Sequence, residues 1–286
     1  MSSIQRAYQN LFTFISKNPV YLVCSIIYYV FAVWFIGGFM WWAWVFFALI
    51  YIISLGVAFS PLGETLLRLF NRVRRLETAR EKQYLRPIFQ EVYDKAKTVN
   101  PELGKIELHI IDTMSVNACA LGQHTIAVTK GAMKPFSEEE LKAILTHEIA
   151  HILNMDTMAL IYTMIGNGIF SVLISIVKVV YWLMGKIETL RPYVDVADKL
   201  FEGMTFAFLF LMQIALAVSD RKAEKRADEY TITLGYGEDM VEALYLLEEI
   251  SLDGGEGIIQ KLLASHPRVT RRIENLEVRL GVQDGK

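Results

Sequence analysis

The feature that most constrains this chain is a long stretch without any charged side chain. Residues 18–63, which are 46 positions between Lys17 and Glu64, contain no Asp, Glu, Lys or Arg. As one helix this block would measure about 69 Å, more than twice the ~30 Å hydrocarbon core of a bilayer. Two membrane spans joined by a tight turn fit the length, and Gly37-Gly38 lies near the middle. The block predicts a membrane protein and excludes a disordered chain, a disulfide scaffold and a simple soluble enzyme.

Two further uncharged stretches follow. The first, residues 157–177, extends past Lys178 to Met184 and is long enough to span a membrane with some tilt. The second, residues 203–219, is at the lower length limit for a span, so a buried core helix is its alternative. Together with the first block, these stretches predict four transmembrane helices at about 19–36, 39–59, 157–184 and 203–219.

The placement of Lys and Arg predicts the orientation. Thirteen of these residues lie in 64–156 and ten in 220–286, whereas the first predicted turn contains none. The positive-inside rule therefore predicts a multi-pass protein of the cell (inner) membrane with both termini and both polar segments in the cytoplasm. The expected domains are an N-terminal region with two spans, a cytoplasmic part, two more spans and a second cytoplasmic part, at 1–63, 64–156, 157–219 and 220–286.

Net charge and cysteine content narrow the partners. The formal net charge of −2 argues against a nucleic-acid partner, which would need a clustered basic excess. Cys24 and Cys119 are too few and too far apart for a disulfide framework or a CxxC metal site. The first apolar run lacks a small-residue cleavage site and is expected to remain as an anchor. Membrane lipid is an expected partner, because the basic, helical residues 60–100 suit contact with anionic lipid.

The polar segments mix the two kinds of secondary structure. Alternating residues predict strands at 105–112 and 125–129. Ser137 and Glu140 form a capping box that opens a helix expected to run into the third span. Further helices are expected at 220–233, 239–250 and 268–280. The predicted fold class is α+β and predominantly helical, with a small β-sheet.

The helix opened by Ser137 contains an HExxH pattern, formed by His147, Glu148 and His151. Four residues are about one helical turn, so both imidazoles project from one face and can bind a single Zn²⁺. Glu148 is placed to take a proton from zinc-bound water. A solvated helix face with incidental histidines is the alternative. Two of the five histidines lie here at ligand spacing, which favours the zinc site.

A catalytic zinc needs a third protein ligand and an open position for water. Two predicted crossings return the chain to the same side of the membrane just before Glu224, and Asp228 follows one helical turn later. Glu224 could bind the metal while Asp228 orients a ligand histidine. An ordinary charged helix explains this stretch equally well, so spacing alone leaves the third ligand open. The candidates are Asp156, His109, His124, His266 and the acids near Glu224, although His109 and His124 are typical of a surface strand and a turn.

Four motifs in order resemble the HtpX family of integral-membrane zinc metalloproteases, which is related to the CAAX prenyl proteases. These motifs are NACALG at 117–122, SEEELKAILTHEIAHILNMDT at 137–157, RKAEKRAD at 221–228 and SHPRVTRRI at 265–273, with predicted spans on either side of the HExxH motif. The resemblance covers nearly the whole chain. It implies a zincin-like (gluzincin-type) metalloprotease domain with one Zn²⁺ per chain.

The resemblance also implies roles for individual residues. The metal ligands would be His147, His151 and Glu224, with Glu148 as general base and Asp228 orienting a ligand. His266 would help to stabilise the oxyanion, and Arg272 would order that loop or assist the oxyanion. Asn117 and Ala118 would lie on an edge strand that pairs with the substrate backbone. Cys119 occupies the family's usual phenylalanine position, which puts substrate preference in doubt.

The expected function is that of a zinc metalloendopeptidase in protein quality control and stress response. It would cleave misfolded or damaged membrane proteins, and unfolded chains, at the cytoplasmic face. One alternative is a CAAX-type prenyl-protein protease, although four spans leave little room for an intramembrane chamber. The other alternative is a non-catalytic membrane scaffold or adaptor that retains zinc. Glu148 argues against a scaffold, because a structural site would not need a base.

Overall fold

The computed structural model describes residues 3–38, 40–189, 191–253 and 269–281. The chain divides into two compact units, each assembled from two segments: Met1–Leu66 with Met158–Ala217, and Leu67–Thr157 with Val218–Lys286. Helices predominate, and the second unit contains a four-stranded sheet. The predicted α+β class is confirmed.

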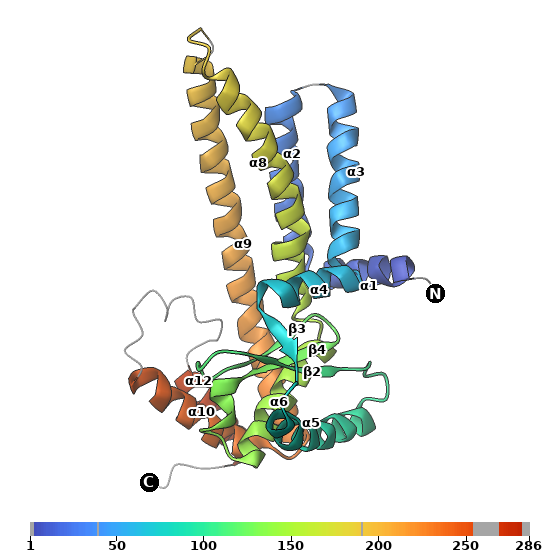
Figure 1. Cartoon of the computed structure of the whole chain (residues 1–286), viewed down its shortest axis with the longest axis vertical. Coiled ribbons are helices and arrows are strands. Elements are labelled where there is room, and N and C mark those ends of the chain that lie inside the picture. Colours follow the sequence, from blue (N-terminus) through green and yellow to red (C-terminus); the bar gives the residue numbers. More distant parts are fainter. Residues whose placement is uncertain (1–2, 39, 190, 254–268, 282–286) are drawn as a thin grey trace. The chain divides into compact units, whose positions relative to one another are not determined.

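The first unit is helical. Helices α2, α3 and α8 pack against one another, and α1 crosses the lower ends of α2 and α3 (Figure 1). A hydrogen bond from Tyr51 Oη on α3 to Asn167 Oδ1 on α8 spans 2.9 Å and joins these two helices. The elements are α1 (Ser3–Lys17), α2 (Pro19–Gly37), α3 (Trp41–Ala58), the start of α4 (Pro61–Phe70), α7 (Met158–Ile161), the π-helical turn η2 (Tyr162–Gly166), α8 (Asn167–Met184) and the first part of α9 (Arg191–Thr233).

The structure supports fewer membrane crossings than the four that the sequence predicts. Among the described residues, α3 is the one helix whose length and apolarity suit a bilayer. Two bent pairs reach the same standard only if each pair is counted as one span: Ala7–Ser16 with Pro19–Trp34, and Glu138–Leu153 with Met158–Gly166. Length and composition therefore support one to three spans, and four remains a prediction.

The second unit is built around the sheet. Strand order is β1-β2-β4-β3, in which the central β2 and β4 are parallel and the two edge strands are antiparallel to their neighbours. Of the predicted strands, 125–129 matches β4, and 105–112 shortens to β2. The elements are β1 (Val73–Arg75), α5 (Ala79–Val99), β2 (Glu107–Ile111), β3 (Ala118–Leu121), β4 (Thr125–Thr129), the 3₁₀ turn η1 (Lys130–Met133), α6 (Glu138–Leu153), the end of α9, α10 (Gly237–Asp253) and α12 (Val269–Leu280).

A partly buried ion pair between Arg74 and Glu81 ties β1 to the start of α5. Glu81 completes a capping box with Thr78, and its carboxylate also accepts hydrogen bonds from Arg74 at 2.7 and 3.1 Å. Arg74 in turn pairs with Asp112 at the end of β2. The Arg74 hydrogen bonds hold the pKa of Glu81 at about 2, despite burial, which raises it. The Glu81 carboxylate of the capping box therefore stays ionised at neutral pH and joins α5 to the sheet.

Helix α6 crosses the core of this unit and is buried over most of its length. Leu141, Leu145 and Ile149 are fully buried beside α5, α10 and β3. The predicted capping box is confirmed, because Ser137 and Glu140 exchange their hydrogen bonds. The predicted continuation of α6 into the third span is wrong. The helix ends at Leu153, and Met155 adopts a left-handed φ of 60°, which α-helical backbone does not allow.

Candidate metal centre

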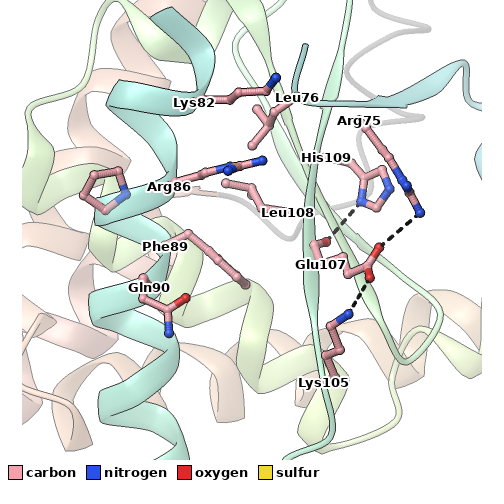
Figure 2. A pocket seen from close by; sticks show the side chains of 11 residues that line it. Arg75, Leu76, Lys82, Arg86, Phe89, Gln90, Lys105, Glu107, Leu108 and His109 are labelled. Atoms are coloured by element: carbon pink, nitrogen blue, oxygen red, sulfur yellow. Dashed lines mark hydrogen bonds and ion pairs between the residues drawn. The ribbon is translucent and has the colours of Figure 1, made fainter. Parts of the chain in front are cut away.

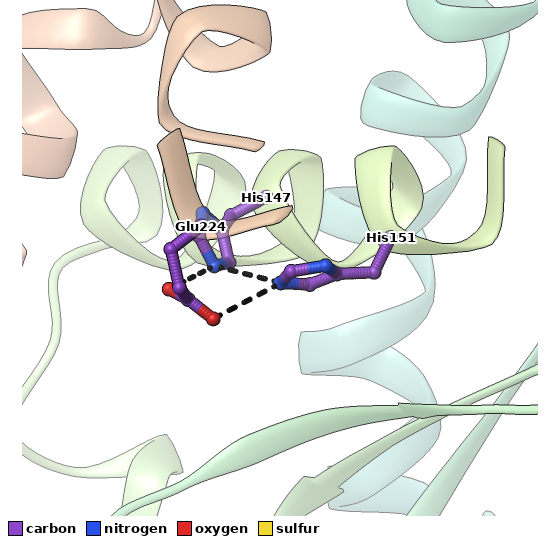
Figure 3. A group of neighbouring side chains, drawn as sticks. All are labelled: His147, His151 and Glu224. Carbon is purple, nitrogen blue, oxygen red and sulfur yellow. Dashed lines mark hydrogen bonds and ion pairs between the residues drawn. The ribbon is translucent and has the colours of Figure 1, made fainter. Parts of the chain in front are cut away.

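Three side chains from two distant segments converge inside the second unit. His147 and His151 project from one face of α6, and Glu224 reaches them from α9 (Figure 3). Their ligand atoms all lie within 4.8 Å of one another, and all three residues are buried. The i,i+4 spacing on α6 aligns the two imidazoles, as the sequence predicts.

The separations match the edges of a tetrahedral metal site. Ligand atoms that bind zinc at about 2.0–2.1 Å with tetrahedral angles lie about 3.3 Å from one another. The two histidine Nε2 atoms are 3.1 Å apart. The Glu224 carboxylate oxygens lie 3.3 Å from His147 Nε2 and 3.5 Å from His151 Nε2. Two imidazoles and one carboxylate at these distances fit a metal with an open coordination position.

Each histidine is oriented by its own carboxylate. Asp228 Oδ1 lies 3.0 Å from His147 Nδ1, and Asp156 Oδ2 lies 3.2 Å from His151 Nδ1. A carboxylate that accepts the Nδ1–H proton leaves the Nε2 lone pair directed at the metal position. Two such lone pairs only 3.1 Å apart repel one another unless a cation lies between them. The tautomers set by Asp228 and Asp156 therefore favour a bound cation.

An arginine holds each of these carboxylates in turn. The Arg272 guanidinium donates to Asp228 at 2.7 and 3.0 Å, and it pairs with Glu224 at 2.9 Å. Arg226 donates to Asp156 at 2.8 Å. The resulting chains of contacts, arginine to carboxylate to histidine, end at the two histidines of the site. In this structure the guanidinium nitrogens of Arg272 are thus directed at the two carboxylates, and its expected roles at the loop and the oxyanion stay predictions.

The carboxylates also determine the charge of the histidines. Burial lowers the pKa of His147, as does the Arg272 charge, but the hydrogen bonds to Asp228 and Glu224 outweigh both and the pKa is raised. Burial likewise lowers the pKa of His151, and Asp156 and Glu224 raise it to about 10. A proton and a metal ion therefore compete for the same lone pairs, so metal binding releases protons.

Glu148 lies beside the histidines but points to a different partner. Its Oε2 accepts a hydrogen bond of 2.7 Å from the backbone N–H of Ala120 on the edge strand β3. In an antiparallel pair, alternate residues direct both backbone groups away from the neighbouring strand. The N–H of Ala120 is thus directed outward from the sheet, and the same alternation directs the backbone groups of Ala118 outward. The outer edge of β3 therefore faces Glu148.

The two residues predicted to bind substrate differ in their placement. Ala118 begins β3, with its backbone on the outer edge. Asn117 precedes the strand, and its backbone is already used: its N–H donates to Thr129 Oγ1 and its C=O accepts from Thr129 N–H. Backbone pairing of Asn117 with a substrate, expected from the resemblance, is therefore not available in this structure. Its side-chain amide is the group that a substrate could reach.

The remaining candidates are placed as follows. His266 lies outside the described residues. His124 is exposed in the turn before β4, as predicted, whereas His109 is 4% exposed on the central strand β2, so its prediction as a surface residue is wrong. Burial, together with the Glu148 charge, raises the pKa of Cys119 to about 12, so this residue stays a thiol at neutral pH. Asp156, one of the candidate ligands, contacts Nδ1 of His151, the ring nitrogen that does not face Glu224.

Replacing Asp156 by Ala tests this contact. We expect zinc affinity to fall by about 10–100-fold, the usual effect of removing the group that orients a ligand histidine. Competition with a chromogenic chelator measures the affinity directly. Arg226→Gln should weaken binding in the same direction but less, and Lys225→Gln, an exposed neighbour on α9, serves as control. Unchanged affinity in Asp156→Ala would show that His151 does not depend on this carboxylate.

Comparisons with known proteins agree with this geometry. The model of Peptidase family M48 matches residues 79–280. Protease HtpX of Xylella fastidiosa (strain 9a5c) is 31% identical over 198 residues, which are 62% of this chain and 68% of that protein. Protease HtpX homolog of Bacteroides fragilis (strain YCH46) is 32% identical over 132 residues, which are 43% of this chain and only 40% of that protein.

A solved structure shares the fold. The chain is similar to the crystal structure of S. mikatae Ste24p with a TM-score of 0.50 and 17% sequence identity, over 94% of this chain and 66% of that one. Fold and site together define a metalloprotease of the HExxH class. The chain belongs to peptidase family M48, and the resemblance to HtpX proteases is confirmed.

Proposed function

We propose that this chain is a zinc-dependent endopeptidase of the cell membrane. Its substrates would be misfolded or damaged membrane proteins and unfolded chains, cleaved on the cytoplasmic side. The observation that carries the proposal is the convergence of His147, His151 and Glu224 at tetrahedral spacing, with Glu148 directly beside them. A buried carboxylate that is free of the ligand set is what a hydrolytic site needs and a structural metal site does not.

The residues of the site would have separate roles in hydrolysis. His147, His151 and Glu224 would hold Zn²⁺, which when bound supplies Lewis acidity toward the carbonyl and the water. Glu148 accepts a proton from the water that attacks the carbonyl carbon. Glu148 then donates that proton to the nitrogen of the breaking C–N bond, so that a carboxylic acid and an amine leave, and the acid gives up its own proton to solvent. His266 is proposed, from the resemblance, to stabilise the oxyanion.

The outer edge of β3 is proposed to hold the substrate. An extended peptide would add to this edge through the backbone of Ala118, with the Asn117 amide as a further contact. Backbone pairing reads little of the side-chain sequence, which suits a protease that acts on unfolded chains. The hydrogen bond from Ala120 N–H to Glu148 would keep the base at the same edge, next to the bound peptide bond.

The membrane arrangement is proposed from the sequence. Spans at about 19–36, 39–59, 157–184 and 203–219 would separate two cytoplasmic segments, 64–156 and 220–286, that together form the protease. The supporting observation is the distribution of Lys and Arg, with thirteen in the first cytoplasmic segment and ten in the second. Membrane lipid would surround the spans, and polypeptides would be the substrates.

Metal removal tests the activity. Purified protein in detergent is expected to cleave an unfolded protein such as reduced casein, to lose this activity after dialysis against a chelator, and to regain it with about one equivalent of Zn²⁺ per chain. Zinc content is measured in parallel by atomic absorption. Activity that survives complete removal of the metal would contradict the proposal.

The same preparation distinguishes the two alternatives. Cleavage of a prenylated peptide ending in a CAAX-derived tripeptide, with no cleavage of unfolded protein, would favour a prenyl-protein protease. One bound zinc without cleavage of either substrate would favour a scaffold. The structural likeness to Ste24p supports a shared fold and does not decide between these activities.

A further inference from the structure

A cavity lies in the second unit between α5 and the strands β1 and β2. Its volume is about 670 Å³. None of the ligand or base residues of the metal centre lines it. Lys82 and Arg86, one helical turn apart on α5, extend over the cavity toward the strands, and Arg75 and Lys105 stand at its other side (Figure 2).

The charges around this cavity are unbalanced. Four permanent cations, Arg75, Lys82, Arg86 and Lys105, face a single carboxylate, Glu107. Glu107 is engaged with Lys105 at 2.9 Å and with Arg75 at 4.0 Å. In the described part of the chain, neither Lys82 nor Arg86 forms an ion pair within 4.0 Å. Two cations on one helix face thus remain to bind an external anion.

The lining also contains an apolar part. Leu76 and Phe89 contribute buried side chains, 8% and 7% exposed, and Pro87 and Leu108 complete the lining. A guanidinium and an ammonium group recognise phosphate oxygens well, the first through paired N–H donors and the second as a point charge. An apolar wall beside them accommodates the hydrocarbon next to such a group. The combination favours a phosphate attached to an organic residue over an acidic peptide.

We propose that this cavity binds a phosphate-bearing anion, held chiefly by Lys82 and Arg86. Such a group can come from the headgroup of an anionic phospholipid or from a soluble phosphate. The order of the elements favours the lipid headgroup over a soluble phosphate, because Arg75 comes only seventeen residues after Ala58, the last residue of the apolar helix α3. The site is separate from the metal centre in residues and in chemistry, so its test does not depend on proteolysis.

Binding is measured with full-length protein. One arm places the protein in nanodiscs of phosphatidylcholine with or without phosphatidylglycerol and counts retained lipid by native mass spectrometry. The other arm titrates inorganic phosphate and glycerol 3-phosphate against protein in a neutral detergent by calorimetry. The variant is Lys82→Gln with Arg86→Gln. The matched control, Lys95→Gln with Lys97→Gln, removes the same charge from the exposed far half of α5.

In one of the two arms, we expect the Lys82/Arg86 variant to bind its probe at least about tenfold more weakly than wild type, because each cation near an anionic headgroup contributes substantially to binding. The affinity of the Lys95/Lys97 control should change by less than about twofold. Loss confined to phosphatidylglycerol identifies a lipid site, and loss in the titration identifies a soluble phosphate site. Equal weakening in both double variants would overturn the proposal, because the effect would then be diffuse charge. Absence of binding in both arms would overturn it too. Arg86→Lys, which keeps the charge, controls for folding and should retain most of the affinity.

Discussion

Glu148→Gln is expected to lower the rate of peptide hydrolysis by about 10²–10⁴-fold without releasing the metal. Glutamine has nearly the shape of glutamate, and its amide oxygen can still accept the 2.7 Å hydrogen bond from Ala120 N–H. It cannot take a proton from water at neutral pH. The three proposed ligands, His147, His151 and Glu224, keep their own contacts. The loss should therefore fall on kcat, with bound zinc unchanged.

Two measurements made on one preparation separate the outcomes of this substitution. Zinc per chain is determined together with cleavage of an unfolded protein in detergent. Glu138→Gln, an exposed glutamate in the first turn of the same helix, is the matched control and should behave as wild type. If Glu148→Gln retains activity within about threefold, Glu148 is not the base. If it loses zinc as well, the division between ligands and base is wrong.

Arg272→Met is expected to lower the free energy of unfolding of zinc-free protein by about 3–5 kcal/mol, the usual cost of removing one partner from a buried ion pair. Arg272 is 7% exposed and contacts the carboxylates of Asp228 and Glu224. Without it, two buried carboxylates lose their permanent cation. Burial lowers the pKa of Arg272, but these two carboxylates raise it overall, so the guanidinium remains charged.

Chemical denaturation in mild detergent, with and without zinc, measures this effect. Bound zinc would supply positive charge at Glu224, one of the two carboxylates, so the destabilisation should be smaller in the zinc-loaded protein. Arg271→Met is the control, because Arg271 precedes Arg272 on α12 and is exposed. Equal stability of the two variants would show that the Arg272 contacts contribute little to the fold. A loss that is independent of zinc would place its role in packing alone.

The local features of the site could be predicted from sequence. The capping box at Ser137 and the i,i+4 histidines of α6 depend only on helical periodicity and on nearby side chains, and the structure shows both. The strand at 125–129 is likewise predicted from the pattern of its own residues. The sequence does not predict that α6 ends at Leu153, because this end depends on the left-handed backbone of Met155 and on the Asn154 cap rather than on hydrophobicity.

Contacts between distant segments could not be predicted in the same way. Asp156 is one of several candidate ligands in the sequence, yet in the fold it contacts His151 Nδ1 and Arg226. The signal that could have found this role was its position five residues after His151, just beyond the helix end. The sequence does not predict β1, because its three residues are of mixed polarity and have no strand pattern. The ion pair between Arg74 of this strand and Glu81 of α5 holds the strand in place.

The sequence by itself determined the apolar segments, the helix with its two histidines, and the family motifs that surround them. These are properties of short stretches, set by charge, by periodicity and by capping side chains. Only the tertiary structure decided that the Glu224 carboxylate meets both histidines, that Arg272 and Arg226 hold the orienting carboxylates, and that the outer edge of β3 faces Glu148. These contacts join residues far apart in the chain, and they form only when the helices pack around the sheet and exclude water from the charges between them.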